Sequence, residues 1–411
     1  MSRVGIVYPR ANIDTVPSLV AAVEEFARTG YAVDVFAYTQ AGQPEPTFDS
    51  PRVHLRSLGV EGLVDHSTAG LRRLAKRVLP SSARAPLRFG YRALAQGLAR
   101  GSRAAVRTAV LERTEPYACM IGVDPDGLVL ARQLADGAPL GYFSLELLLS
   151  AETTTTDERA LKAKERELSR RAAFVVVQDQ ARAHLLAQDN GIDPERLVLV
   201  PNAPPGPARR QPSRFWHDRF ELPETTRVVL HSGSLGDWTG VEAIVQSACD
   251  WPEPWALVVH TRYDAASSAY VDGLRASADP NRVHFSLKPV PRQDYEPLID
   301  GADAGLAFYV AVAGSSFTGM NVETIGLSSG KLAYYLRAGL PVVVNQSASI
   351  AERVESFGCG LGVNDATGIA AALEDLDADH DAHSLRALEF FDQYLDPRPA
   401  LRQLVARVAA L

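Results

Sequence analysis

The chain has 411 residues, which is too long for one hydrophobic core and predicts two domains. With 46% hydrophobic and 22% charged residues, its composition is that of a globular protein and excludes wholesale disorder. The formal net charge of −7 does not indicate a nucleic-acid-binding chain, so we expect no nucleic-acid partner.

The cysteines and the apolar runs predict a cytoplasmic protein. Cys119, Cys249 and Cys359 lie far apart, which is typical neither of a disulfide framework nor of a zinc site. The apolar run in residues 1–8 is too short for the core of a signal peptide. No window of about 18 apolar residues occurs in the sequence, so no membrane-spanning helix is predicted.

The first half of the chain alternates buried strands with amphipathic helices. Residues 4–8 form a predicted strand, residues 17–29 a helix with one apolar face, and residues 32–37 the next strand. Gly30 ends the helix, as glycine commonly does. This strand–helix–strand order predicts a parallel sheet covered on both faces. Further strands are expected at 118–123, 140–144, 174–177 and 197–201.

A proline-rich segment then divides the sequence. Residues 201–207 contain four prolines, which neither a helix nor a central strand tolerates, so this segment is the predicted linker. The segment from about 383 to 411 is predicted to be helical, with a kink at Pro397 and Pro399. Between the two, strands are expected at 228–231, 256–260, 283–285, 304–308 and 341–344.

These elements predict an α/β fold with two tandem, doubly wound, Rossmann-like domains. We expect the first domain at 1–205, the second at 206–382, and a C-terminal helix at 383–411 that crosses back to the first domain. In such a pair the carboxyl ends of the strands face a cleft between the domains, where a ligand binds. The alternation of strands and helices alone does not distinguish a transferase from a dehydrogenase or a binding protein.

The segment with the clearest chemistry is residues 319–345, GMNVETIGLSSGKLAYYLRAGLPVVVN. Ser328 and Ser329 precede a predicted helix that starts near Gly330, and either serine can cap its first turn. Free amides at a helix N-terminus, two hydroxyls and the cation Lys331 form an anion site suited to a diphosphate. We expect Lys331 to supply the larger share of the attraction.

The string SSGKLAYYLRAGLPVVV resembles the Ser-x-Lys-Leu-x-Glu-Tyr-Leu-x-x-Gly-x-Pro-Val-Val segment of GT-B glycosyltransferases, particularly of the family 4-like group with many retaining enzymes. Other landmarks follow in the family's order. LHSGSLGDW at 230–238 is similar to the first strand and Gly-rich turn of the donor domain, and DYEPLIDGAD at 294–303 to a later helix. Val200, Pro201 and Asn202 resemble the end of the acceptor domain.

The resemblance implies a transferase that moves a sugar from a nucleoside diphosphate sugar to an acceptor hydroxyl or amine. The first domain would bind a carbohydrate, lipid-linked or small-molecule acceptor, and the second the donor. It also implies that no metal or other cofactor is required, and no histidine spacing in the chain is typical of metal ligands. The implied donor-binding residues are Gly233, Ser234, Arg262, Ser328, Ser329, Lys331 and Tyr334.

The sequence also departs from the family pattern. The family has Glu, which would hold the ribose hydroxyls, where this chain has Tyr334, and a tyrosine makes no bidentate carboxylate contact. A second carboxylate, nearer the sugar, is expected eight residues earlier, where this chain has Gly326; Glu323 is the nearest substitute. Either the donor contacts are rewired, or activity is reduced, or the register of the match differs.

Two acids follow strands of the first domain. Asp124 and Glu146 lie just after the strands at 118–123 and 140–144, where they are expected to face the cleft. Either could be a general base or bind an acceptor hydroxyl; the alternative is a solvated loop acid. With Glu323 and Lys331 they complete the predicted catalytic set.

Residues 66–111 contain ten basic and no acidic residues. Within 71–107 this segment could dock on an anionic surface at the inner face of the membrane or bind a phosphorylated acceptor; the alternative is a solvated basic helix pair.

Two rival functions also remain at this point. One is a sugar-nucleotide epimerase of the same architecture, and the other is a non-catalytic GT-B protein that binds a nucleotide or a partner.

Overall fold

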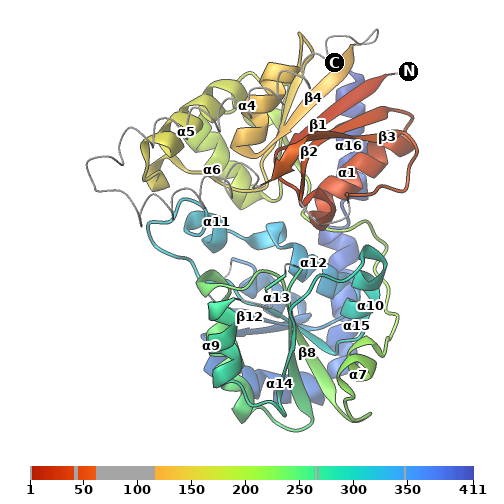
Figure 1. Cartoon of the computed structure of the whole chain (residues 1–411), viewed down its shortest axis with the longest axis vertical. Helices are drawn as coiled ribbons and strands as arrows, with labels where there is room; N and C mark the ends of the chain where they lie inside the picture. The colour runs from red at the N-terminus through yellow and green to blue at the C-terminus, as the bar shows by residue number, and fades with distance from the viewer. Residues whose placement is uncertain (1, 41–44, 62–115, 263, 266–267, 347–348) are drawn as a thin grey trace, which may run out of the picture.

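The computed structural model describes residues 2–40, 45–61, 116–262, 264–265, 268–346 and 349–411. These residues form two α/β domains that lie one above the other along the long axis (Figure 1). The basic segment 71–107, with its predicted membrane contact, lies outside the described residues. None of the described helices combines the length and the apolar character needed to cross a membrane.

The first domain is built on a parallel sheet. Within the described residues its seven strands are, in spatial order, β3 (Val53–Glu61), β2 (Ala32–Gln40), β1 (Arg3–Tyr8), β4 (Tyr117–Val123), β5 (Leu140–Phe143), β6 (Phe174–Val177) and β7 (Leu197–Leu199). The helices of this domain are α1 (Pro17–Arg28), α4 (Asp124–Leu134), α5 (Thr156–Ser169) and α6 (Gln180–Asn190).

The second domain repeats this plan. Its six strands in the described residues are β10 (Val283–Ser286), β9 (Trp255–His260), β8 (Arg227–Ser232), β11 (Ala304–Ala307), β12 (Val342–Asn345) and β13 (Gly360–Val363), again all parallel. The helices are α7 (Phe215–Phe220), α8 (Val241–Ser247), α9 (Ala269–Ser277), α10 (Tyr295–Asp300), α11 (Met320–Glu323), α12 (Gly330–Arg337), α13 (Ala351–Phe357), α14 (Ile369–Ala378) and α15 (His380–Phe390).

The predicted fold class, two doubly wound parallel-sheet domains, is confirmed. Every strand predicted from the sequence is present, and β2 extends farthest beyond its predicted end, to Gln40. The strands β3 and β13 were not predicted. Each lies at an edge of its sheet, where fewer apolar residues are needed than in a central strand.

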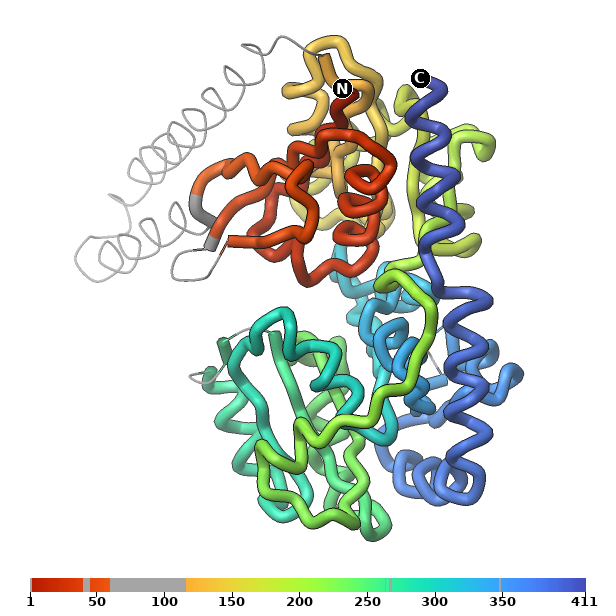
Figure 2. Tube along the Cα trace, turned by 90° about the vertical axis from the view of Figure 1, so that its right-hand side faces the viewer, coloured from red at the N-terminus to blue at the C-terminus, as the bar shows by residue number. Residues whose placement is uncertain are grey.

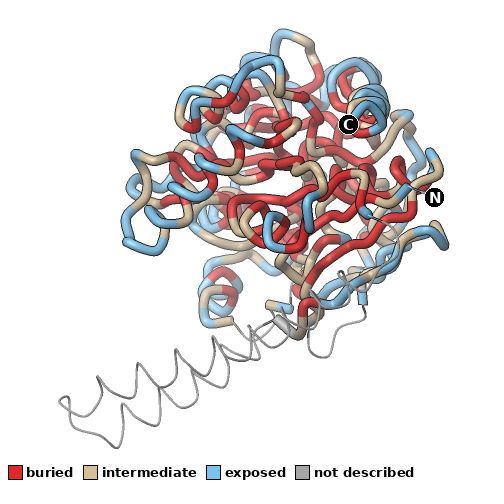
Figure 3. Tube along the Cα trace, turned by 90° about the horizontal axis from the view of Figure 1, so that it is seen from above, coloured by how far each residue is buried: buried red, intermediate tan, exposed pale blue. Residues whose placement is uncertain are grey.

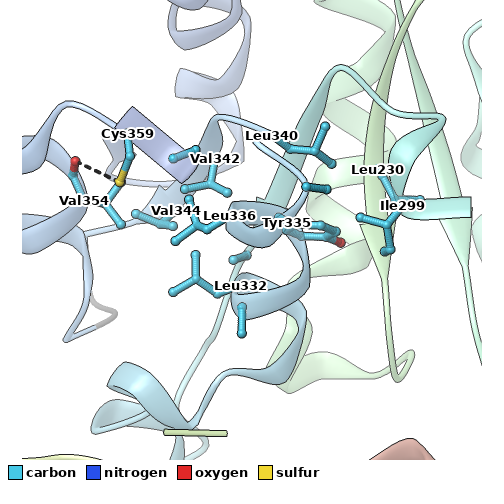
Figure 4. Close-up of a cluster of buried hydrophobic side chains, with 14 of the residues drawn as sticks. Leu230, Ile299, Leu332, Tyr335, Leu336, Leu340, Val342, Val344, Val354 and Cys359 are labelled. Carbon is cyan, nitrogen blue, oxygen red and sulfur yellow. Dashed lines mark hydrogen bonds between the residues drawn. The ribbon is translucent and has the colours of Figure 1, made fainter. Parts of the chain in front are cut away.

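The apolar stripe predicted for helix α12 lies in the core of the second domain. Leu332, Tyr335 and Leu336 are fully buried and pack beside Val342 and Val344 of β12 (Figure 4). Ser329 is the N-cap, and its side chain accepts a hydrogen bond from the backbone N–H of Leu332 at 3.2 Å. This cap and stripe fix where the helix begins and how it is rotated.

The C-terminal helix joins the two domains. After α15 the chain passes through one π-helical turn, Phe391–Leu395, and continues as α16 (Arg398–Ala409). Figure 2 shows this blue segment rising from the second domain along the side of the first. Leu401, Leu404 and Val408 of α16 are buried in the core formed by β1, β2 and α1. Seen from above, buried residues follow the strands and exposed residues the outer helices (Figure 3).

Candidate active site

A cavity of about 490 Å³ lies between the domains, where the carboxyl ends of both sheets point. Helices α11 and α12 lie on the side of the second domain that faces the first (Figure 1). The lining residues of the first domain and the linker follow β1, β5 and β7: Tyr8, Arg10, Asn12, Thr15, Val16, Pro17, Leu145, Glu146 and Asn202. Those of the second domain follow β8, β9 and β11 or begin α12, and they include Gly233, Ser234, Trp238, Arg262, Asn321, Ser328, Ser329 and Lys331.

Lys331, in the first turn of α12, is the predicted cation of the phosphate site. Its Nζ donates a weak hydrogen bond to the Phe308 carbonyl at 3.4 Å and lies 4.5 Å from the centroid of the Tyr309 ring. Among the described residues it forms no ion pair. Burial therefore lowers the pKa of Lys331 to about 7, because little water and no carboxylate stabilise its charge. An anion entering the cavity would restore that stabilisation.

The two predicted capping serines have different surroundings. Ser329 caps α12 and is also hydrogen-bonded to the Tyr309 hydroxyl. Ser328 does not cap the helix; its carbonyl accepts a hydrogen bond from Asn202 Nδ2 at 3.0 Å, which ties the linker to the start of α12. Both serines line the cavity together with Gly330 and Lys331, the first two residues of α12.

Arg262 follows β9 and bridges the domains. It donates to the Thr15 carbonyl of the first domain and to the Tyr295 hydroxyl of the second. Its guanidinium lies 4.2 Å from the centroid of the Tyr295 ring and 5.5 Å from that of Tyr334. Tyr334 packs edge-on against Tyr295 and does not line the cavity, so the residue that replaces the family's Glu supports Arg262 instead.

Gly233 and Ser234, two of the predicted donor-binding residues, form the turn after β8 and line the cavity. Gly233 has φ of +145°, a conformation that residues with a Cβ rarely adopt. A Cβ built there would meet no atom within 4 Å, so the turn leaves open space above its backbone.

The two acids of the first domain differ in position. Glu146 lines the cavity, and its carboxylate accepts a hydrogen bond from Asn321 Nδ2. Asp124, by contrast, is fully buried and does not line the cavity, which corrects the expectation that it faces the cleft. It accepts hydrogen bonds from the backbone N–H groups of Leu145 and Glu146, both at 2.9 Å, and pairs with Arg10 at 3.1 Å. Asp124 therefore holds the loop that carries Glu146.

Two family models match the chain. A glycosyl transferase 4-like domain matches residues 16–203, and the C-terminal domain of a glucosyltransferase 3-like family matches residues 320–405. The two matches fall on either side of the cavity and together contain half of its lining residues. The chain is a GT-B glycosyltransferase of the family 4-like group.

Solved structures support the same fold for this glycosyltransferase. HepE of Anabaena, crystallised with UDP-glucose, is 16% identical with a TM-score of 0.68, and 100% of each chain is covered. Sucrose-phosphate synthase of Thermosynechococcus elongatus is 15% identical with a TM-score of 0.70, covering 100% of this chain and 99% of its own. WaaG, a glycosyltransferase involved in lipopolysaccharide biosynthesis, is 15% identical with a TM-score of 0.58, covering 98% and 99%. Comparison with the curated proteins gave no match.

Position 326 of the glycosyltransferase has no room for a side chain, which explains the glycine there. A Cβ there would overlap Asp179 Oδ2, which accepts a hydrogen bond from the Leu327 N–H at 3.1 Å. Glu323, the nearest substitute for the missing acid, is exposed on α11 and does not line the cavity. Neither Gly326 nor Glu323 is among the residues that line the cavity.

Sequence reasoning missed several residues of the glycosyltransferase cavity, chiefly Asn321, Arg10 and Tyr309. A polar residue after β1 or β11 gives a weak signal, and nothing in the sequence connects Asn321 with Glu146, to which it is hydrogen-bonded. Among the described residues, no group of three or more His, Cys, Asp or Glu is placed to hold a metal ion.

Proposed function

We propose that this glycosyltransferase uses a uridine diphosphate sugar as donor, with the diphosphate at the start of α12 and the sugar toward Glu146. The observation that carries the proposal is Lys331, a cavity-lining cation with a lowered pKa and no ion-pair partner among the described residues. Uridine is favoured because HepE was crystallised with UDP-glucose and with UDP and glucose.

Charge develops on the departing diphosphate during transfer. Lys331 and the first amides of α12 lie where they would stabilise that charge, and Arg262 adds a second cation on the same wall of the cavity. Groups that bind the leaving diphosphate more strongly than the intact donor lower the barrier. Arg262 also contacts Thr15, so the donor wall is connected to the first domain.

The acceptor lies on the side of the first domain in this proposal. Glu146, Asn12 and Arg10 line that wall and offer an anion, an amide and a cation to acceptor hydroxyls. As the family resemblance implies, transfer retains the anomeric configuration and needs no metal. Both points are checked by making the product in the presence of a chelator and measuring the coupling constant of its anomeric proton. A product with inverted configuration contradicts retention, and the absence of product contradicts independence of metal.

A thermal-shift screen against uridine, guanosine, adenosine, cytidine and thymidine diphosphates tests donor binding. Ligand at about 100 times its dissociation constant adds about 2.7 kcal/mol to the free energy of unfolding, which gives a visible shift. We expect the largest shift with UDP, and we expect it to be lost in Lys331→Ala. Lys164→Ala, which removes an exposed lysine of α5, is the matched control and should respond to UDP as the wild type does. No shift with any nucleotide would overturn the proposed function.

A further inference from the structure

A fully buried arginine lies at the junction of the two domains. Arg182, in the first turn of α6, donates to the Leu145 carbonyl and to Asn321 Oδ1, both at 2.6 Å, and to the Asn321 carbonyl at 3.1 Å. It forms no ion pair with the described residues, and burial lowers its pKa. The hydrogen bonds of this buried charge go to neutral oxygens, and the carboxylates of Glu146, Asp179 and Asp124 stabilise the charge without a direct ion pair among the described residues.

The side-chain amide of Asn321 is fixed in one orientation by this arginine. Its Oδ1 accepts from Arg182 and from the Leu147 N–H at 2.8 Å. Its Nδ2 donates to the Phe317 carbonyl at 3.0 Å and to Glu146 Oε2. The flipped amide would set its oxygen against a carboxylate and its N–H groups against a cation. Arg182 therefore ensures that an N–H donor points at Glu146.

Glu146 is held by one oxygen and keeps the other available. Its backbone N–H is bound by Asp124, and its Oε2 by Asn321. In the described part of the chain, Glu146 Oε1 makes no hydrogen bond, so it is available to a substrate hydroxyl. A carboxylate restrained in this way presents one oxygen at a set position in the cavity.

The network spans both domains. Asn321 is on α11 of the second domain, whereas Arg182 and Glu146 belong to the first, so these contacts exist only while the two domains lie together as in this structure. We propose that Arg182 and Asn321 are positioning residues that orient the Glu146 carboxylate when the domains close. This inference rests on the proposed function for its kinetic readout. Substrate binding that favours closure of the domains would thereby also orient the Glu146 carboxylate.

Asn321→Leu tests the proposal, since leucine has a similar volume and no polar group. We expect kcat to fall at least about tenfold while the KM for the UDP-sugar changes by less than about threefold. We also expect a larger radius of gyration by small-angle X-ray scattering in saturating UDP. Arg182→Lys, which keeps a charge beside Asn321 Oδ1, should retain more kcat than Arg182→Met.

Arg292→Met is the matched control. Arg292 also joins the domains, through the Thr47 carbonyl at 2.7 Å and Glu24 at 3.2 Å, but it is exposed and does not line the cavity. If Asn321→Leu matches this control in kcat, the inference is overturned. If the wild type turns over no UDP-sugar, the proposed function fails separately. The radius of gyration then decides: a value for Asn321→Leu equal to that of the wild type overturns the inference.

Discussion

At the scale of single residues, the cavity depends on the incompletely compensated charge of Lys331. Its ammonium lies over the Tyr309 ring, and among the described residues a carbonyl is its only hydrogen-bond acceptor. Aromatic faces and carbonyls stabilise a cation less than a carboxylate does. Lys331 therefore keeps much of its attraction for an incoming diphosphate.

The lowered pKa of Lys331 predicts how UDP binding depends on pH. Burial places this pKa at about 7, so above pH 7 the empty site increasingly holds a neutral lysine. UDP binds the charged form, and its phosphates are already ionised in this range, so binding takes up a proton. The dissociation constant for UDP should rise by up to about tenfold per pH unit between about pH 7 and 9.

Isothermal titration calorimetry measures this dependence. Titrations in two buffers of different ionisation enthalpy give the protons taken up per UDP bound. Lys331→Met should bind UDP weakly, with a dissociation constant that stays nearly constant over the same range. A wild-type dissociation constant that does not change with pH would show that Lys331 is already charged in the empty site.

At the scale of elements, the packing of α12 on the second sheet sets the position of the phosphate site. Tyr335 lies against β11, and its hydroxyl accepts a hydrogen bond from the Ser232 N–H at 2.8 Å, next to the Gly233 turn. Gly305 of β11 makes room for this ring: a Cβ there would overlap it. The buried ring thus links the second half of α12 with the end of β8.

Gly305→Ala should therefore both destabilise the protein and weaken UDP binding. Overpacking of this kind costs about 1–3 kcal/mol, and any displacement of α12 moves Lys331 with it. Gly273→Ala is the comparison, because a Cβ at this position of α9 meets no atom within 4 Å. In a helix that change stabilises by about 0.5–1 kcal/mol. Thermal unfolding with and without UDP gives both effects, and equal behaviour of the two variants would contradict the packing argument.

The elements also show what the sequence could predict. Central strands such as β6 and β12 are continuous apolar runs, so the local sequence is enough to predict where they lie in the chain. The strand β13 has two glycines in four residues and gives almost no local signal. In the site, Lys331 was predictable because a capping serine and a lysine stand together before an apolar stripe. Arg182 and Asn321 are 139 residues apart, and only the closed pair of domains brings them together.

At the scale of the whole molecule, the closed arrangement is held from three sides. Asn321 and Arg262 join the domains at the cavity, Arg292 joins them at an exposed edge, and α16 crosses from the second domain to the first. The backbone N–H groups of Gly206 and Ala208 donate to Asp396 and Asp392, so the linker is tied to the segment that precedes α16. The two chain segments that connect the domains therefore run together.

Because α16 completes the core of the first domain, a change near the C-terminus should destabilise the N-terminal half. Leu404 is fully buried among residues of β1, β2 and α1, and Leu404→Ala should cost about 2–5 kcal/mol. Leu411→Ala, at a half-exposed position, should have no measurable effect. Hydrogen exchange followed by mass spectrometry locates the loss: faster exchange is expected in β1 and β2, with β9 and β12 unchanged. Faster exchange confined to the second domain would mean that α16 stabilises the domain it leaves rather than the one it joins.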